Sequence, residues 1–396
     1  MQSMKILTKT ILILSLVSLL TDVSSEMLYP VMPLFLTSIG FSVIWIGIIE
    51  GIAEATAGFS KGYFGKLSDA SGKRVPFVRL GYLLSSIAKP ALILIAHPLW
   101  VVFIRTLDRL GKGVRTSARD AILSDESTDE NKGKVFGLHR AADTLGGAIG
   151  PVIALIFLYF YPGEYVLLFL LAFIPAIIGV LFTFFLKDKK EKIKQNEERI
   201  HFISFLKYWK SANREYRKLV PALIVFTVFN SSDMFLLLFA KYRGLSDELV
   251  IICYIFYNLV YALFSAPMGY LGDKIGLKNS FLIGLLFFVI TYLSIVFASE
   301  QIHFFIIFFL YGIFGAGTEG ISKAWISNLA DRSETATAIG FYNSFQSIGA
   351  LLASIGAGLA WSLIAPTAPF LISGLGVFAI IIYIKFAVGK NRLLSA

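Results

Sequence analysis

The chain has 396 residues, of which 56% are hydrophobic and 16% are charged, and its mean hydropathy is +0.74. A soluble domain needs polar atoms to cover its surface, and this composition supplies too few polar residues. It therefore excludes a soluble domain. The formal net charge of +10 would fit a nucleic-acid-binding protein, but the segment 187–218 holds eleven basic and five acidic residues and so carries six of those charges. No base-stacking or groove-reading motif accompanies them, so we expect a basic cytoplasmic loop and no nucleic-acid partner.

Hydrophobic runs along the chain are long enough to cross a bilayer, which takes about 20 residues in a helix. In chain order they predict spans at 10–36, 43–65, 77–96, 99–122, 134–160 and 164–186, then at 219–241, 248–270, 280–298, 302–329, 335–362 and 366–386. The first run resembles a signal peptide, but no small-residue cleavage site follows it, so we expect it to be retained. The sequence therefore predicts an all-α membrane protein of twelve transmembrane helices, with an N-terminal six-helix bundle (1–186), a basic linker (187–218) and a C-terminal six-helix bundle (219–396).

The charges of the connecting segments predict the orientation. Lysine and arginine occur in the linkers after the even-numbered spans and in both tails, whereas the other linkers lack them, except for Lys241 and Arg243 after the seventh span. Because basic loops stay in the cytoplasm, both termini are predicted to be cytoplasmic. We expect a multi-pass protein embedded in the lipid bilayer of a prokaryotic plasma membrane, which in bacteria is the inner membrane.

The two halves of the chain repeat each other. The eight residues GKLSDASG at 65–72 recur as GYLGDKIG at 269–276. Three further pairs keep the same order, namely 24–27 with 231–234, 111–113 with 315–317, and 137–146 with 340–349. Two homologous bundles around a central site are the architecture of alternating access, in which one half rocks against the other.

These motifs resemble those of the major facilitator superfamily along the whole chain. The first repeat resembles its signature loop between helices two and three, while 109–113 and 146–151 are similar to its fourth-helix arginine motif and its fifth-helix antiporter motif. Ala70, Lys112 and the pair Ala154 and Leu155 depart from those patterns. Within the superfamily the chain resembles a prokaryotic branch labelled multidrug or siderophore efflux. The resemblance implies the major facilitator fold, a monomer, and a gating role for Gly65, Asp69, Gly72, Arg74, Gly269, Asp273 and Gly276.

Charged residues inside the predicted spans are candidates for function, because an ionisable group at membrane depth costs a few kcal/mol or more unless it is paired or hydrated. On the fourth span, bases and one acid recur at steps of three and four and form a single stripe, which we expect to face water or acids rather than lipid. The first span carries two acids one turn apart, and so does the second. The proton-coupling or ion-pair candidates are Asp22, Glu26, Glu50, Glu54, Arg105, Asp108, Arg109 and Asp143.

Two interpretations of this set stay open, a proton switch and a static network of ion pairs. For a switch, the first choice is Asp22 or Glu26 acting against Arg109, because a change in hydration or in partner distance changes the protonation of a carboxylate. The resemblance implies that helices one, four, seven and ten line the central cavity. The candidates for contact with the substrate are Arg115, Arg119, His139, Arg140, Asp233, Glu319, Lys323, Asn343 and Gln346.

The favoured hypothesis is a secondary transporter that exports a small organic solute, drug-like or siderophore-like, in exchange for protons. The alternatives are an importer of an anionic solute, which the arginine stripe favours, and an exporter of a divalent metal such as iron. A membrane enzyme, a scramblase or a sensor is a different class, but the chain has no nucleotide-binding loop and no HExxH motif, so we expect neither enzymatic activity nor a cofactor. The single cysteine, Cys253, excludes an intramolecular disulfide and a cysteine-based zinc cluster, and no resident metal is predicted.

Overall fold

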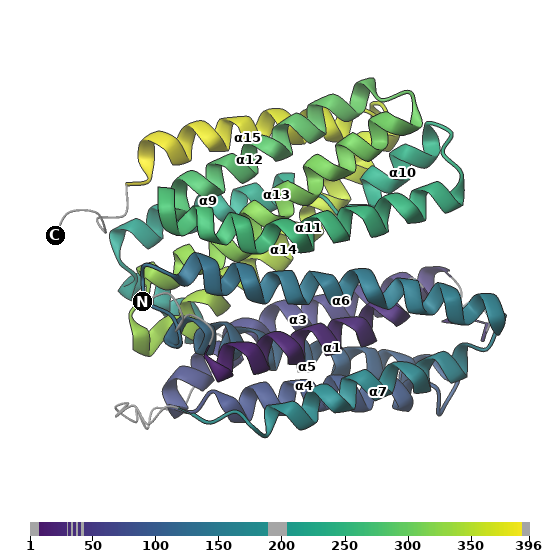
Figure 1. The fold of residues 1–396 in the computed structure, drawn as a ribbon, viewed down its shortest axis with the longest axis horizontal. Coiled ribbons are helices and arrows are strands. Elements are labelled where there is room, and N and C mark those ends of the chain that lie inside the picture. Colours follow the sequence, from purple (N-terminus) through teal and green to yellow (C-terminus); the bar gives the residue numbers. More distant parts are fainter. Residues whose placement is uncertain are drawn as a thin grey trace. The chain divides into compact units, whose positions relative to one another are not determined.

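The computed structural model describes residues 8–29, 31–32, 35–36, 39–40, 43–188 and 204–389, and within these ranges the secondary structure is helical without a strand. In the first half of the chain the long helices are α1 (Lys9–Leu28), α3 (Val43–Ser71), α4 (Val75–Leu92), α5 (Pro98–Asp125), α6 (Lys132–Phe160) and α7 (Tyr165–Thr183), as Figure 1 shows. Each of them corresponds to one of the six predicted spans.

The second half begins with the short turns η1 (Ser204–Lys207) and α8 (Tyr208–Ser211). The helices that follow are α9 (Arg214–Phe229), α10 (Met234–Tyr242), α11 (Asp247–Ile275), α12 (Leu277–Ser294), α13 (Gln301–Leu329), α14 (Thr335–Leu363) and α15 (Ala368–Ala387), with the turns η2 (Ile295–Phe297) and η3 (Arg332–Glu334) between them. Residues 230–233 divide the seventh predicted span into α9 and α10. Among the described residues, eight helices are long and apolar enough to cross a membrane, and the all-α prediction is confirmed.

Local sequence explains where several helices begin and end. The Thr8 hydroxyl accepts a hydrogen bond from the Ile11 N–H at 3.3 Å and so caps α1, and the Asn213 side chain caps α9 in the same way at Tyr216. Gly72 and Gly276 follow α3 and α11 with φ of +65° and +90°. Only glycine adopts these angles without strain, so both signature loops turn at the same point of the repeat.

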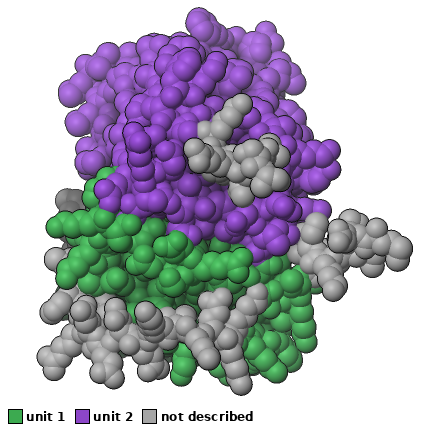
Figure 2. All heavy atoms as spheres, turned by 90° about the vertical axis from the view of Figure 1, so that its left-hand side faces the viewer, with its two compact units in different colours: residues 1–126, 142–211, 331–347 green, residues 127–141, 212–330, 348–396 purple. Residues whose placement is uncertain are grey.

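The chain forms two compact units (Figure 2). Unit 1 contains residues 1–126, 142–211 and 331–347, and unit 2 contains residues 127–141, 212–330 and 348–396. Two helices are therefore divided, because the beginning of α6 belongs to unit 2 and the beginning of α14 belongs to unit 1. Each unit thus includes a short segment from the other half of the sequence.

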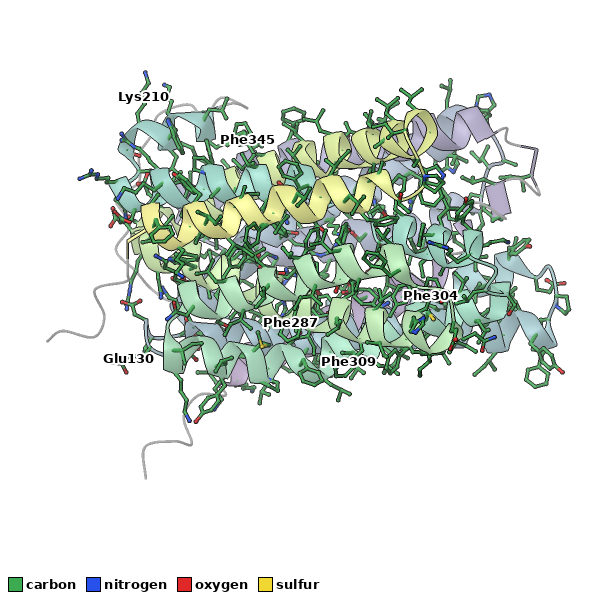
Figure 3. The ribbon with its side chains drawn as sticks, turned by 90° about the horizontal axis from the view of Figure 1, so that it is seen from above. Glu130, Lys210, Phe287, Phe304, Phe309 and Phe345 are labelled. Carbon is green, nitrogen blue, oxygen red and sulfur yellow. The ribbon has the colours of Figure 1, made fainter. Side chains whose placement is uncertain are left out.

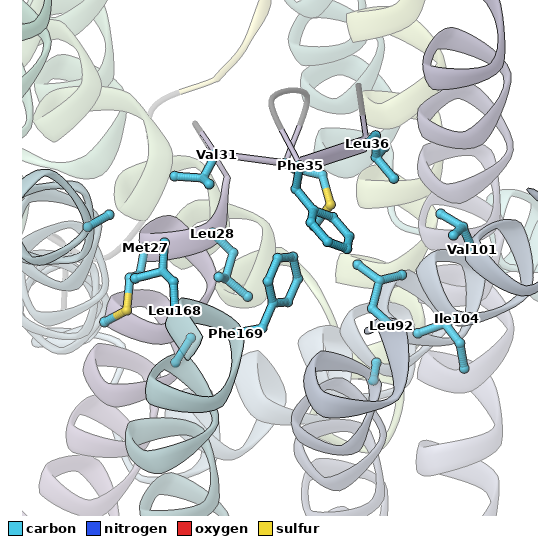
Figure 4. Close-up of a cluster of buried hydrophobic side chains, with 14 of the residues drawn as sticks. Met27, Leu28, Val31, Phe35, Leu36, Leu92, Val101, Ile104, Leu168 and Phe169 are labelled. Carbon is cyan, nitrogen blue, oxygen red and sulfur yellow. The ribbon is translucent and has the colours of Figure 1, made fainter. Parts of the chain in front are cut away.

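In unit 1, helix α1 packs on α7, and α4 packs on α5 and α7. A cluster of buried apolar side chains fills the space among these helices, and Phe35 and Phe169 meet in it with ring centroids 4.9 Å apart (Figure 4). In unit 2, Phe304 of α13 is fully buried whereas Phe309 on the same helix is 37% exposed (Figure 3). Large apolar side chains also cover outer faces, including Phe184, Phe297 and Phe386. Such surfaces are stable against lipid rather than water.

Candidate functional site

The first signature loop in unit 1 holds the beginning of α14. The Asp69 carboxylate accepts hydrogen bonds from the Thr337 N–H at 2.7 Å, the Thr337 hydroxyl at 2.8 Å and the Ala336 N–H at 3.4 Å. Gly65 permits this contact, since a Cβ at that position would lie 2.5 Å from the Ala336 carbonyl oxygen. A carboxylate at the N-terminus of a helix satisfies free N–H groups and complements the helix dipole. The loop therefore docks the beginning of α14 on α3.

The second signature loop makes the same contact in unit 2. The Asp273 carboxylate accepts hydrogen bonds from the N–H groups of Gly133 at 2.9 Å and Lys134 at 2.8 Å, at the beginning of α6. A Cβ on Gly269 would overlap the carbonyl oxygen of Gly133. Each repeat thus caps the second and third residues of a helix from the other half of the sequence.

Arg74 connects the first loop to three neighbours. Its guanidinium lies 3.3 Å from Asp69 and 2.5 Å from Asp125, and it donates a hydrogen bond to the Arg332 carbonyl at 2.9 Å. Asp69 follows the predicted span that ends at residue 65, and burial raises the pKa of its carboxyl group to about 6 against the opposing effects of Arg74 and Thr337. Asp188, at the start of the linker, accepts hydrogen bonds from the Arg74 N–H at 2.7 Å and from the next N–H at 2.9 Å.

Arginines of the α5 stripe are buried inside unit 1. Arg115 donates a hydrogen bond to the Ser85 hydroxyl at 2.7 Å and stacks on the Tyr82 ring at 4.4 Å. Arg119 lies 2.9 Å from Asp120, the next residue on the same helix. Lys112, which precedes Arg115 by three residues in the stripe, is exposed. Protein atoms, rather than lipid, surround the two arginines.

Two predicted carboxyl groups come together beside Arg119. Asp22 of α1 lies beside Asp143 of α6, and its Cβ lies near the position that a Cβ on Gly146 would occupy. Asp143 also accepts a hydrogen bond from the Ser18 hydroxyl and lies 4.0 Å from the Arg119 guanidinium. Two neighbouring carboxylates repel each other, and a proton bound to one of them removes that repulsion. The sequence predicts Arg109 as the basic partner of Asp22 or Glu26. In the structure Asp143 lies next to Asp22, and the charge of Lys112 also acts on Asp22.

Other candidates line an opening in unit 1. Its charged residues are Glu26, Lys89, Arg105, Asp108 and Arg109, from α1, α4 and α5. Arg105 pairs with Asp108 at 3.5 Å. The Lys89 ammonium donates hydrogen bonds to the Ser85 carbonyl at 3.3 Å and the Ser25 hydroxyl at 3.4 Å. Sequence reasoning missed Lys89, although a lysine inside the predicted span 77–96 was the signal that could have found it.

In unit 2, Arg140 of α6 lies 3.1 Å from Glu319 of α13. Its Nε donates a hydrogen bond to the Tyr261 hydroxyl of α11 at 2.6 Å. Sequence reasoning selected the two charged residues but not Tyr261, because a tyrosine in an apolar run has no pattern that separates it from packing.

The remaining candidates differ in how deeply they are buried. His139 and Asn343 are buried, while Asp233, Lys323 and Gln346 are half-buried. Glu50 and Glu54 belong to α3, but their side chains lie outside the described residues. Among the described residues, no three histidine, cysteine or acidic side chains form a group that could hold a metal ion.

Comparison with known proteins identifies the family. The profile of the Major Facilitator Superfamily matches residues 14–260 and 223–392 of this chain. The chain belongs to the major facilitator superfamily. It is a transmembrane transporter in a lipid bilayer that carries a small-molecule substrate, and it has the twelve-helix fold that the motifs predicted.

Relatives of this transporter extend over most of its length. It is 36% identical over 371 residues to an uncharacterised MFS-type transporter of Methanocaldococcus jannaschii, covering 92% of this chain and 91% of the relative. It is 23% identical over 344 residues to the multi-drug resistance efflux pump PmrA of Streptococcus pneumoniae, covering 84% of each. The fold is similar to that of the human organic anion transporter MFSD10, with a TM-score of 0.79 at 16% identity over 96% of this chain and 100% of that structure.

Proposed function

We propose that this transporter exports a small organic solute in exchange for protons, by alternating access, as a monomer in a prokaryotic plasma membrane. The observation that carries the proposal is the pair of carboxyl groups of Asp22 and Asp143 beside Arg119. Two acids and one cation at this depth form a site that can exist with or without a bound proton. The similarity to PmrA, named as a multidrug efflux pump, supports export and a drug-like solute.

The proton has two competing partners in this site. When it is bound, the two carboxyl groups share it and Asp22 stays close to α6. When it leaves, like charges on the two acids repel each other, and Asp143 turns to the arginine 4.0 Å away. Protonation therefore changes the force between α1 and α6. A change in that force is what couples proton movement to a change in helix packing.

The two signature loops supply the gate in this proposal. Asp69 and Asp273 each hold the first turn of a helix whose remainder belongs to the other unit. Hydrogen bonds to a helix end form and break without disturbing the hydrophobic core. We therefore assign them to one of two alternating states, in which both helix beginnings are docked.

The proposal is tested with purified protein in liposomes that carry an imposed pH gradient, acidic inside. Uptake of a fluorescent lipophilic cation should follow the gradient in the wild type and in Asp129→Asn, a control acid whose side chain is 53% exposed. The Asp22→Asn and Asp143→Asn variants should lose the gradient-driven part of uptake and keep exchange of dye across the membrane. If both variants retain gradient-driven uptake, the carboxyl pair is not the proton site.

A second candidate function is transport of an anionic solute, which the opening in unit 1 favours. Lys89, Arg105 and Arg109 bring three positive charges to its wall, against two acids. The same liposomes distinguish the two functions if a fluorescent organic anion replaces the cation. Uptake of the anion that is lost in Lys89→Met, together with no uptake of the cation, would favour this second function.

A further inference from the structure

The arginine of α6 in unit 2 is held as a cationic ligand would be. The Arg140 guanidinium lies 5.3 Å from the centre of the Tyr261 ring, donates a hydrogen bond to the hydroxyl of the same tyrosine at 2.6 Å, and pairs with Glu319 at 3.1 Å. An aromatic ring and a carboxylate around one delocalised cation are the groups that recognise organic cations in proteins. The three residues come from α6, α11 and α13, so tertiary structure assembles this cage.

The cage is open to its surroundings on one side and aromatic on the other. The side chains of Arg140 and Glu319 are 25% and 36% exposed, whereas Tyr261 is only 4% exposed. Behind it, the Tyr257 ring lies 6.0 Å from the Tyr261 ring and 4.9 Å from the Tyr311 ring. The Tyr257 and Tyr311 rings therefore extend the aromatic surface that Tyr261 offers to an aromatic solute.

We infer that Arg140 is an internal substitute for the cationic group of the transported solute, and that Tyr261 and Glu319 form the binding site for an organic cation of the guanidinium or aryl-ammonium class. The inference rests on the proposed function, because it needs a state in which the first turns of α6 leave the cage. Those turns reach the cage through the close approach of Gly137 to the Ser265 carbonyl and through the Asp273 cap. Release of that cap withdraws Arg140.

Exchange of Arg140 for a solute preserves the charge balance. Glu319 has a positive partner in both states, so neither state leaves this partly buried carboxylate without a counter-ion. The departing guanidinium is partly exposed already and recovers hydration as it leaves. The solute therefore competes with Arg140 for one site, and its apparent affinity is lowered by that competition.

The test is equilibrium binding of radiolabelled phenylguanidinium, an aryl-substituted guanidinium ion, to the purified full-length protein. Arg140→Ala should bind this cation about twofold to fivefold more tightly than the wild type, since an ion pair of this exposure changes an equilibrium constant by up to about fivefold. Glu319→Gln should bind it about tenfold more weakly, and the double variant should lose the gain. Glu215→Gln is the matched control, because Glu215 is 39% exposed and pairs with Lys218 at 2.9 Å, outside the cage.

Each outcome decides the inference. Equal affinity in the wild type and Arg140→Ala overturns it, as does Glu319→Gln with unchanged affinity or no measurable binding to any variant. Arg140→Lys keeps the charge without the planar group and should resemble the wild type more than Arg140→Ala does, and the melting temperature of each variant shows that it is folded. Binding needs no pH gradient, so the expected pattern of affinities without proton-driven transport would refute the proposed function and leave the cage in place.

Discussion

The hydroxyl group of Thr337 offers a direct test of how the first signature loop holds α14. Replacing Thr337 by valine keeps the shape of the side chain and removes only the hydroxyl that donates to Asp69 at 2.8 Å. Asp69 is 5% exposed, so water does not readily replace the lost donor. A hydrogen bond to a buried charged group contributes about 2 kcal/mol, and one to a neutral group about 1 kcal/mol.

Measurements at two pH values distinguish the hydrogen bond to the charged carboxylate from the one to the neutral carboxyl group. The pKa of Asp69 is raised to about 6 by burial, so the carboxyl group is mainly ionised at pH 8 and mainly neutral at pH 5. We expect Thr337→Val to favour undocking of residues 335–347 about 30-fold at pH 8 and only about fivefold at pH 5. Loss of this donor also raises the pKa of Asp69 further, because in the wild type the hydrogen bond from Thr337 lowers that pKa.

Hydrogen–deuterium exchange of the peptide 335–347, corrected for the intrinsic pH dependence of exchange, measures this undocking. Thr318→Val is the matched control, since Thr318 is buried but donates to the Phe314 carbonyl of its own helix at 2.9 Å. Unchanged protection at pH 8, or an equal loss at both pH values, would refute the reasoning about the Asp69 cap.

Three other predictions concern the same contacts. The native chain binds the Asp69 proton more tightly than the unfolded chain does, because the pKa of Asp69 is about 6 in the native chain against 3.8. The free energy of unfolding should therefore decrease by up to about 3 kcal/mol as pH rises from about 4 to about 6. If the melting temperature of the wild type does not fall relative to that of Asp69→Asn over this rise in pH, the prediction is wrong. Gly269→Ala should overpack the contact with Gly133, destabilise it by about 1–3 kcal/mol and increase hydrogen exchange in residues 133–141. The control Gly356→Ala, with open space around its Cβ, should have no such effect. Equal effects of the two substitutions would count against the Asp273 cap. Trp209→Leu should remove a ring that stacks on Phe341 at 5.8 Å and so destabilise the docking of residues 335–347 by about 1 kcal/mol in the same exchange experiment. Unaltered exchange in this variant would exclude a role for the stacked rings.

Sequence patterns predicted the helices well because lipid acts on each segment separately. Runs of apolar residues, the spacing of charges on α5 and the repeat at 65–72 and 269–276 are all local in the chain. The division of the seventh span at 230–233 was missed, because those few polar residues interrupt an otherwise apolar run without a glycine or proline to mark the break. Residue type and spacing were enough to select candidate residues, but they did not predict which residues contact each other in the fold. The sequence predicts Arg109 as the partner of Asp22, whereas the structure places Asp143 beside it. Lys89 lines the charged opening although most other residues of its helix are apolar.

The sequence by itself determined that this protein spans a membrane, that its halves are related, and that its spans carry charges which need partners. Composition and periodicity suffice for this because a bilayer excludes unpaired polar groups wherever they occur along the chain. Only the tertiary structure decided that Asp69 and Asp273 cap helices from the opposite halves, that two carboxyl groups share one site, and that Arg140 fills an aromatic cage. These contacts join residues more than a hundred positions apart, and their geometry depends on how whole helices pack rather than on any local preference.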